Sequence, residues 1–349
     1  MREERKSPAA DPAADPAEPT DQPAIRERIV STNGVDLHVV DAGDGPPVIL
    51  SHGFPELSYS WRHQVPALAA AGYRVLAPDQ RGYGRSSRPS AIDDYDIVHL
   101  TDDLLGLLDD IGEERAVFVG HDWGAMVVWT LAQLAPERVA GVVGMSVPFL
   151  PRAPMPPTQL LRQVLGDAFF YILYFQEPGV ADAELGADTA TTMRRMLAGR
   201  LPGDGTEIDP VVMFANDGRG FVERMPDPDG LPDWLDQAEL DHYIAEFTRT
   251  GFTGGLNWYR NFDRNWELTA HLAGGKIEVP SLFIGGTLDP VLIMSPPSGM
   301  DGWLTDHRGT TLIEGAGHWV QQHSPAEVNA ALIGFLDALA GEDRWRQPI

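Results

Sequence analysis

The chain has 349 residues, of which 43% are hydrophobic and 22% are charged, values ordinary for a soluble globular protein. Its 26 basic and 51 acidic side chains give a net charge of −25, and so acidic a surface repels phosphate backbones, which excludes nucleic acid as an expected partner. The lack of cysteine excludes a thiol nucleophile, a cysteine-ligated metal and a disulfide framework, and it fits a reducing compartment.

The first 23 residues differ in composition from the rest of the chain. Residues 1–23 are rich in proline, alanine and acidic side chains, which cannot build a packed core, so we expect a disordered tail. They contain no apolar stretch of the kind that forms a secretory signal, and no run of about 18 apolar residues follows later in the chain. We therefore expect a cytoplasmic protein without a membrane span.

After this tail, residues 24–148 alternate compact apolar runs with amphipathic stretches. Strands that alternate with helices predict a mostly parallel sheet. Residues 101–112 have leucines spaced three and four apart and end in a glycine, which is typical of a helix. We expect strands at residues 34–43, 46–53, 73–79, 116–120 and 139–147.

The alternating pattern stops where five prolines crowd into residues 148–159, a cluster that marks a boundary between structural units. Residues 149–262 then read as helices and loops, which predicts a helical cap. Strand character returns at residues 279–290 and 309–317, and a final amphipathic helix follows at 325–340. The sequence therefore predicts an α/β core that is interrupted by the cap and completed by residues 263–349.

One short motif in the first part of the core carries a candidate nucleophile. Gly120-His121-Asp122-Trp123-Gly124 lies between a predicted strand and a run of good helix formers. This spacing matches a nucleophile elbow, a sharp strand-to-helix turn that usually presents a serine, but its centre is Asp122. Taken alone, Asp122 fits equally well as the N-cap of a helix, so the interpretation depends on partners elsewhere in the chain.

Two later residues provide those partners. An elbow nucleophile is followed along the chain by an acid and then by a histidine. Asp289 comes directly after the strand that begins the second part of the core, and open α/β sheets place their sites at such carboxyl ends. His318 lies in the turn before the last helix. The order and the contexts predict a catalytic triad of Asp122, Asp289 and His318.

The loop at His52-Gly53-Phe54-Pro55 is the second candidate element of the site. In α/β folds with an elbow, the loop after this strand and the residue after the nucleophile each supply a backbone N–H to an oxyanion hole. We expect these donors to be the amides of Phe54 and Trp123, although a tight turn alone would also use glycine and proline here.

A carboxylate nucleophile restricts the chemistry. Attack on an ester or amide carbonyl would give an anhydride, whereas attack on an sp3 carbon with a leaving group gives an alkyl ester that activated water can hydrolyse. The substrate is therefore expected to be an epoxide or an alkyl halide. An epoxide oxygen needs an acid that is protonated at neutral pH, a role that suits tyrosine. Spacing alone does not choose among the tyrosines of the cap, which are Tyr171, Tyr174, Tyr243 and Tyr259.

From about Ile25 to the C-terminus the chain resembles the soluble-type epoxide hydrolases of the α/β-hydrolase superfamily. The resemblance rests on HGFPELSYSWRHQVPAL, DQRGYGRSS, GHDWGA, YFQEPG, GLNWYRNFDRNW and GHWVQQHSP. It implies an α/β-hydrolase fold with a helical cap and an epoxide as the small-molecule substrate. It also implies that Asp122 is the nucleophile, His318 the base and Asp289 its orienting acid.

The same resemblance implies that Tyr171 and Tyr259 assist ring opening, and it makes Tyr174 a pocket residue beside Phe54 and Trp123. No metal or organic cofactor is expected, because side chains provide the nucleophile, base and acid, and a homodimer is left open. A haloalkane or haloacid dehalogenase with the same triad is the alternative enzyme. Many haloalkane dehalogenases have asparagine where this chain has Phe54, but some haloacid dehalogenases share the HGFP form. The tyrosine pair is therefore the stronger argument for an epoxide. A non-catalytic receptor on this fold would have no need for His318.

Overall fold

The computed structural model describes residues 24–199 and 214–346, so the expected tail at 1–23 lies outside the described residues. The described chain contains an eight-stranded sheet with the order β1-β2-β4-β3-β5-β6-β7-β8. Its strands are β1 (Ile25–Thr32), β2 (Val35–Ala42), β3 (Pro47–Ser51), β4 (Arg74–Pro78), β5 (Ala116–His121), β6 (Val139–Met145), β7 (Ser281–Gly286) and β8 (His307–Ile313).

The sheet is mostly parallel, as the sequence predicts. β2 runs antiparallel to both of its neighbours, β1 and β4. From β4 onward, each strand runs parallel to the next in the order β4, β3, β5, β6, β7 and β8. Every residue of β3, β5, β6 and β7 is buried, because helices cover both faces of the sheet. β1 was not among the expected strands. It is an edge strand with mostly exposed side chains, so it lacks the apolar run that identified the others.

Two layers of helices enclose the sheet, one on each face. On one face, Val48 and Leu50 of β3 belong to the same apolar cluster as Leu336 of the last helix. On the other face, Ile49 belongs to a cluster with Leu104, because successive side chains of a strand point to opposite sides. The helices concerned are α1 (Gln64–Ala70) and α14 (Pro325–Gly341) on the first face, and α2 (Ile97–Asp110) and α3 (Trp123–Leu134) on the second.

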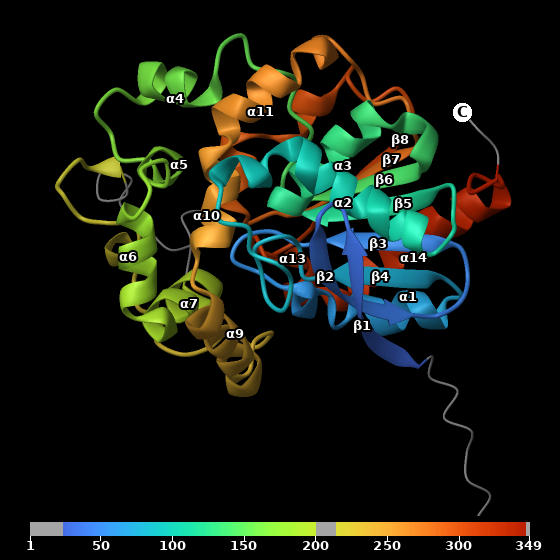
Figure 1. Cartoon of the computed structure of the whole chain (residues 1–349), viewed down its shortest axis with the longest axis horizontal. Helices are drawn as coiled ribbons and strands as arrows, with labels where there is room; N and C mark the ends of the chain where they lie inside the picture. The colour runs from blue at the N-terminus through green and yellow to red at the C-terminus, as the bar shows by residue number, and fades with distance from the viewer. Residues whose placement is uncertain (1–23, 200–213, 347–349) are drawn as a thin grey trace, which may run out of the picture.

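A second group of helices is inserted in the chain between β6 and β7, and Figure 1 shows α4 to α7 and α9 gathered to one side of the sheet. The helices are α4 (Pro157–Leu165), α5 (Tyr171–Tyr174), α6 (Val180–Ala187), α7 (Thr189–Ala198), α9 (Gln237–Thr250), α10 (Thr253–Arg260) and α11 (Phe262–Leu268). The exact cap limits at 149 and 262 stay predictions.

The inserted helices are fastened to the core by polar contacts as well as by packing. The Tyr243 hydroxyl on α9 lies 2.8 Å from the Ser60 hydroxyl of the core, and Arg62 forms an ion pair of 2.6 Å with Glu239. Short helices complete the described chain: α12 (Pro290–Met294), α13 (Val320–His323), η1 (Ser58–Trp61), η2 (Ile92–Tyr95), η3 (Pro136–Arg138), η4 (Val222–Arg224), η5 (Ala270–Leu272) and η6 (Pro297–Met300). Across 24–199 and 214–346, no helix combines the length and the apolar content that a bilayer crossing requires.

Candidate active site

The turn between β5 and α3 places Asp122 at the carboxyl end of a central strand. Asp122 has φ of 52° and ψ of −119°, a backbone conformation that residues other than glycine rarely adopt. The flanking glycines allow the turn to be this tight. A Cβ atom on Gly124 would lie 1.9 Å from the Ser51 carbonyl oxygen, and one on Gly120 would lie 2.1 Å from the carbonyl oxygen of Gly124. The motif is therefore a strained elbow and not an ordinary helix cap.

The structure brings the other two predicted triad residues to Asp122. Asp289 follows β7 and His318 follows β8, so all three residues lie at the carboxyl edge of the parallel strands. His318 Nδ1 is 3.1 Å from both carboxylate oxygens of Asp289, and His318 Nε2 is 3.5 Å from Oδ2 of Asp122. Asp289 also accepts a 2.9 Å hydrogen bond from the Val291 amide, which fixes its orientation. One imidazole thus faces two carboxylates.

The two carboxylates control the charge of that imidazole. Burial opposes a positive charge on His318, but Asp289 and Asp122 outweigh burial and raise its pKa well above the ordinary value. Burial would likewise raise the pKa of Asp289, but its interactions with His318 hold that pKa low. Asp289 therefore stays ionised, and the loss of the charge on Asp122 would lower the pKa of His318.

The predicted oxyanion loop contacts the nucleophile directly. The Phe54 amide donates a 2.8 Å hydrogen bond to Oδ1 of Asp122. Trp123 is the first residue of α3, where backbone N–H groups lack intrahelical acceptors, so its amide is free of helix pairing. The Tyr259 ring packs edge-on against the rings of Phe54 and Trp123, at centroid distances of 5.4 and 5.1 Å.

Tyr171 and Tyr259 are brought together over the elbow. Tyr171 begins α5 and Tyr259 lies near the end of α10, yet their ring centroids are 6.0 Å apart. Burial raises the pKa of both hydroxyls, and the negative charge of Asp122 raises each further. Both hydroxyls therefore remain protonated at neutral pH and are able to donate a proton near the carboxylate.

Tyr174 lies in a different environment. Its ring packs on Phe169 at 5.3 Å, and after burial a hydrogen bond to Glu184 is the main reason why its pKa is raised. Asp122 contributes to the raised pKa at Tyr171 and Tyr259, whereas Glu184 and Glu223 contribute at Tyr174. The placement of Tyr174 in the substrate pocket stays a prediction. Tyr243 bonds instead to Ser60 and, at 3.2 Å, to Gln322.

A buried carboxylate–imidazole pair behind the triad was missed by the sequence reasoning. His121 Nδ1 lies 2.7 Å from Glu56, and both side chains are fully buried. The other ring nitrogen of His121 lies 2.8 Å from the backbone oxygen of His318. Glu56 also accepts a 3.1 Å hydrogen bond from the Gly53 amide. The pair thus connects the oxyanion loop, the elbow and the loop that carries the base.

The sequence does contain a signal for this pair. His121 directly precedes Asp122 and is the last residue of a strand that is otherwise apolar, and an imidazole buried there needs a polar partner. Glu56 directly follows the oxyanion loop His52-Gly53-Phe54-Pro55. Ser146 was missed as well: its hydroxyl donates to the backbone oxygen of His318 at 2.7 Å, and it also helps to lower the pKa of Asp289.

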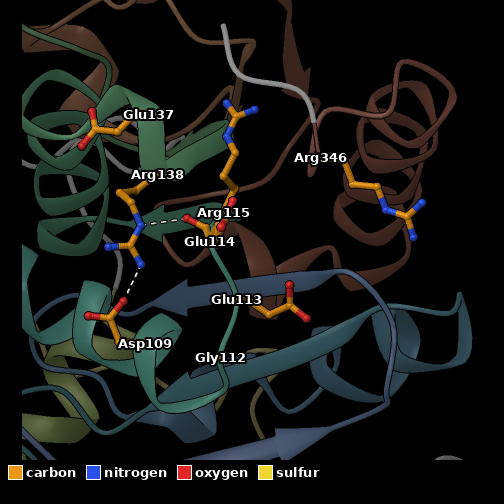
Figure 2. Close-up of a pocket in the computed structure, with 8 residues that line it drawn as sticks. All are labelled: Asp109, Gly112, Glu113, Glu114, Arg115, Glu137, Arg138 and Arg346. Atoms are coloured by element: carbon orange, nitrogen blue, oxygen red, sulfur yellow. Dashed lines mark hydrogen bonds and ion pairs between the residues drawn. The ribbon is translucent and has the colours of Figure 1, made fainter.

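A surface hollow of about 480 Å³ lies at the end of the parallel strands opposite to the triad (Figure 2). It is formed around the amino ends of β5 and β6, whereas Asp122 follows the carboxyl end of β5. Arg138 bridges this hollow by bonding to the Glu114 backbone oxygen and to Asp109. Its lining residues are Asp109, Gly112, Glu113, Glu114, Arg115, Glu137, Arg138 and Arg346. The hollow does not include any residue of the predicted triad. Within residues 24–199 and 214–346, no group of three or more side chains is placed to hold a metal ion.

Comparisons with known proteins agree on one family. A profile of the alpha/beta hydrolase fold matches residues 46–325. The chain is 63% identical over 319 residues to epoxide hydrolase A of Mycobacterium tuberculosis, which covers 90% of this chain and 98% of that protein. It is 41% identical over 325 residues to epoxide hydrolase 1 of Siraitia grosvenorii, with 89% and 98% covered.

Solved structures give the same result. The crystal structure of epoxide hydrolase A from Mycobacterium thermoresistibile has a TM-score of 0.87 at 60% identity, covering 90% of this chain and 98% of that one. An epoxide hydrolase from an endophytic Streptomyces has a TM-score of 0.87 at 43% identity, with 91% and 96% covered. The sheet, the elbow and the family profile define an α/β hydrolase, as the sequence predicts. Within that class, the chain belongs to the epoxide hydrolases.

Proposed function

We propose that this protein hydrolyses an epoxide to a vicinal diol through a covalent alkyl-enzyme ester on Asp122. The observation that carries the proposal is the strained elbow, which holds a carboxylate against the Phe54 amide with His318 behind it. Tyr171 and Tyr259 lie near enough for the charge of Asp122 to raise the pKa of both hydroxyls, which keeps them protonated. Relatives that are named epoxide hydrolases support the substrate class, and those reported above give no support to the dehalogenase alternative.

In the first step, an oxygen of Asp122 attacks a ring carbon of the epoxide and the C–O bond to that carbon breaks. The departing oxygen becomes an alkoxide and takes a proton from Tyr171 or Tyr259. The product of this step is a hydroxyalkyl ester of Asp122. Asp289 and Asp122 together raise the pKa of His318, and ester formation removes the charge of Asp122. The pKa of His318 then falls, and the imidazole can release its proton to solvent and act as a base.

In the second step, His318 takes a proton from water, and the oxygen of that water attacks the ester carbonyl. The amides of Phe54 and Trp123 donate to the oxyanion that forms. Collapse breaks the bond between the carbonyl carbon and the alkyl oxygen, which leaves as the second hydroxyl of the diol. Of the two protons of water, one completes that hydroxyl and the other restores the tyrosine.

A single-turnover experiment in water enriched in heavy oxygen tests this route. With enzyme in excess over epoxide, we expect mostly unlabelled diol and label in the peptide that contains Asp122, because the diol takes its oxygen from the carboxylate. Over many turnovers the diol should become labelled. Direct attack by water would instead label the diol in the first turnover and leave the peptide light, and this result would overturn the proposal.

A further inference from the structure

A glutamine side chain links the two helices that carry the tyrosines. Gln176 follows α5, and its side-chain nitrogen donates to the Ile172 backbone oxygen at 2.8 Å. The same nitrogen donates to the Tyr259 backbone oxygen on α10 at 2.9 Å. A primary amide nitrogen has two protons, so each carbonyl receives one. Gln176 is half-buried, next to the fully buried Phe175.

Both carbonyls lie where a helix runs out of its own donors. The last four carbonyls of a helix lack an intrahelical N–H, and α5 has only four residues. In α5, the Phe175 amide bonds to Tyr171 and the Gln176 amide bonds to Leu173, which leaves the carbonyl of Ile172 to the glutamine side chain. Tyr259 is the next-to-last residue of α10. Gln176 therefore caps two helix ends at once.

A separate contact network, which does not involve Gln176, also holds these helices together. Arg260 donates to the Phe175 backbone oxygen at 3.2 Å and to Asn257 at 2.8 Å, and it forms an ion pair with Asp182 on α6. Thr253 on α10 also donates to Asp182, at 2.6 Å. These contacts keep the segments packed without Gln176, so the glutamine bonds act mainly on the local position of the tyrosines.

We infer that Gln176 is a positioning residue for ring opening, which sets the separation of the Tyr171 and Tyr259 hydroxyls. The inference rests on the proposed role of these tyrosines. Two donors can serve one epoxide oxygen only if their separation is fixed, and a misplacement of about 1 Å is able to cost on the order of 10²-fold in rate. Ester hydrolysis uses His318 and the backbone amides of the oxyanion hole, so it should not depend on Gln176.

The test compares Gln176→Met with Gln133→Met. Gln133, also half-buried, caps the Gly275 backbone oxygen at 2.9 Å and provides a matched control away from the tyrosines. Rapid-quench mass spectrometry measures the rate at which the alkyl-enzyme forms and the rate at which it decays. For Gln176→Met we expect alkylation to slow by about tenfold and decay to remain unchanged. Gln133→Met should change neither rate.

A double-mutant cycle separates positioning from general damage. In a Tyr259→Phe background, Gln176→Met should slow alkylation much less than in the wild type, because its effect acts through the Tyr259 hydroxyl. An equal factor in both backgrounds, or equal slowing of both steps, would overturn the inference. If Gln176→Met does not fold, Gln176→Glu, which lacks the two donors, replaces it in the cycle.

The same rate measurements separate a failure of the Gln176 role from a failure of the proposed tyrosine role. Alkylation that is unchanged in Tyr259→Phe and in Tyr171→Phe would refute the role of the tyrosines. Alkylation that is slow in Tyr259→Phe but normal in both Gln176→Met and Gln176→Glu would refute only the role of Gln176.

Discussion

At the scale of single residues, the elbow presents an aspartate where such turns usually present a serine, and this difference changes which steps need the histidine of the triad. A serine in this place would have to give its proton to the histidine as it attacks, whereas the proposed Asp122 nucleophile is a carboxylate that attacks without this step. In the proposed mechanism, His318 is then needed only for the second step, when water attacks the ester. The geometry agrees with this division, because the imidazole is 3.5 Å from Asp122 and 3.1 Å from Asp289.

This division of labour gives a prediction for His318→Gln. Alkylation of Asp122 should survive and hydrolysis should fail, because no base remains to activate water. Intact-protein mass spectrometry should therefore show the protein heavier by one substrate. His99→Gln, a change on the partly exposed face of α2, is the control and should turn over normally. Normal turnover by His318→Gln, or no adduct, would show that His318 is not the hydrolytic base.

At the scale of elements, two helices bring together Tyr171 and Tyr259, the proposed donor pair, which are 88 positions apart in the chain. Neither helix is stable alone, since α5 has four residues and α10 has eight. They are ordered by aromatic packing, for example Phe175 against Tyr259 at a centroid distance of 5.1 Å, and by the hydrogen bonds of Gln176 at the two helix ends. The donor pair is therefore a product of cap packing.

Because the two hydroxyls back each other up, Tyr171→Phe or Tyr259→Phe alone should leave residual activity. Each single change should lower kcat/KM by roughly 10²–10³, by analogy with the loss of one oxyanion-hole donor. The double variant should be close to inactive. Tyr174→Phe is the matched control, because its hydroxyl bonds to Glu184. A loss in Tyr174→Phe as large as that in Tyr171→Phe would contradict the choice between these neighbours.

At the scale of the whole molecule, Glu56 joins core, cap and active site. It accepts hydrogen bonds of 2.9 Å from the side chains of Gln321 and Gln322 and contacts His121, while Gln322 bonds in turn to Tyr243 of the cap. Burial would raise the pKa of Glu56, but the interactions with His121 outweigh it and lower the pKa from 4.5 to about 2. Folding therefore favours the ionised form.

A lowered pKa stabilises the fold at pH values above the unfolded value near 4.5, and this stability is lost as the pH falls toward about 2. The lowered pKa of Glu56 corresponds to a contribution on the order of 3 kcal/mol to the free energy of unfolding. Urea denaturation at several pH values between 5 and 2.5 should show the wild type losing more stability than Glu56→Gln. Parallel losses in the two proteins would mean that Glu56 does not contribute to acid stability.

The sequence by itself determined the features that depend on local pattern. Alternating apolar runs predicted the parallel sheet and its helices, because burial on both faces imposes hydrophobic strands. The strand–turn–helix context of Asp122, with Asp289 and His318 following later strands, predicted the triad, because parallel strands bring their carboxyl ends to one edge. The edge strand β1 escaped prediction, since exposed strands carry little apolar signal.

Tertiary structure alone decided which polar side chains meet across long sequence separations. Spacing did not separate Tyr171 from Tyr174, whereas packing places Tyr171 beside Tyr259 and bonds Tyr174 to Glu184. Glu56 and His121 are 65 positions apart, and no periodicity connects them. The physical reason is that a hydrophobic pattern encodes which face of an element is buried. The partner of a buried polar group is set only when elements far apart in the chain pack together.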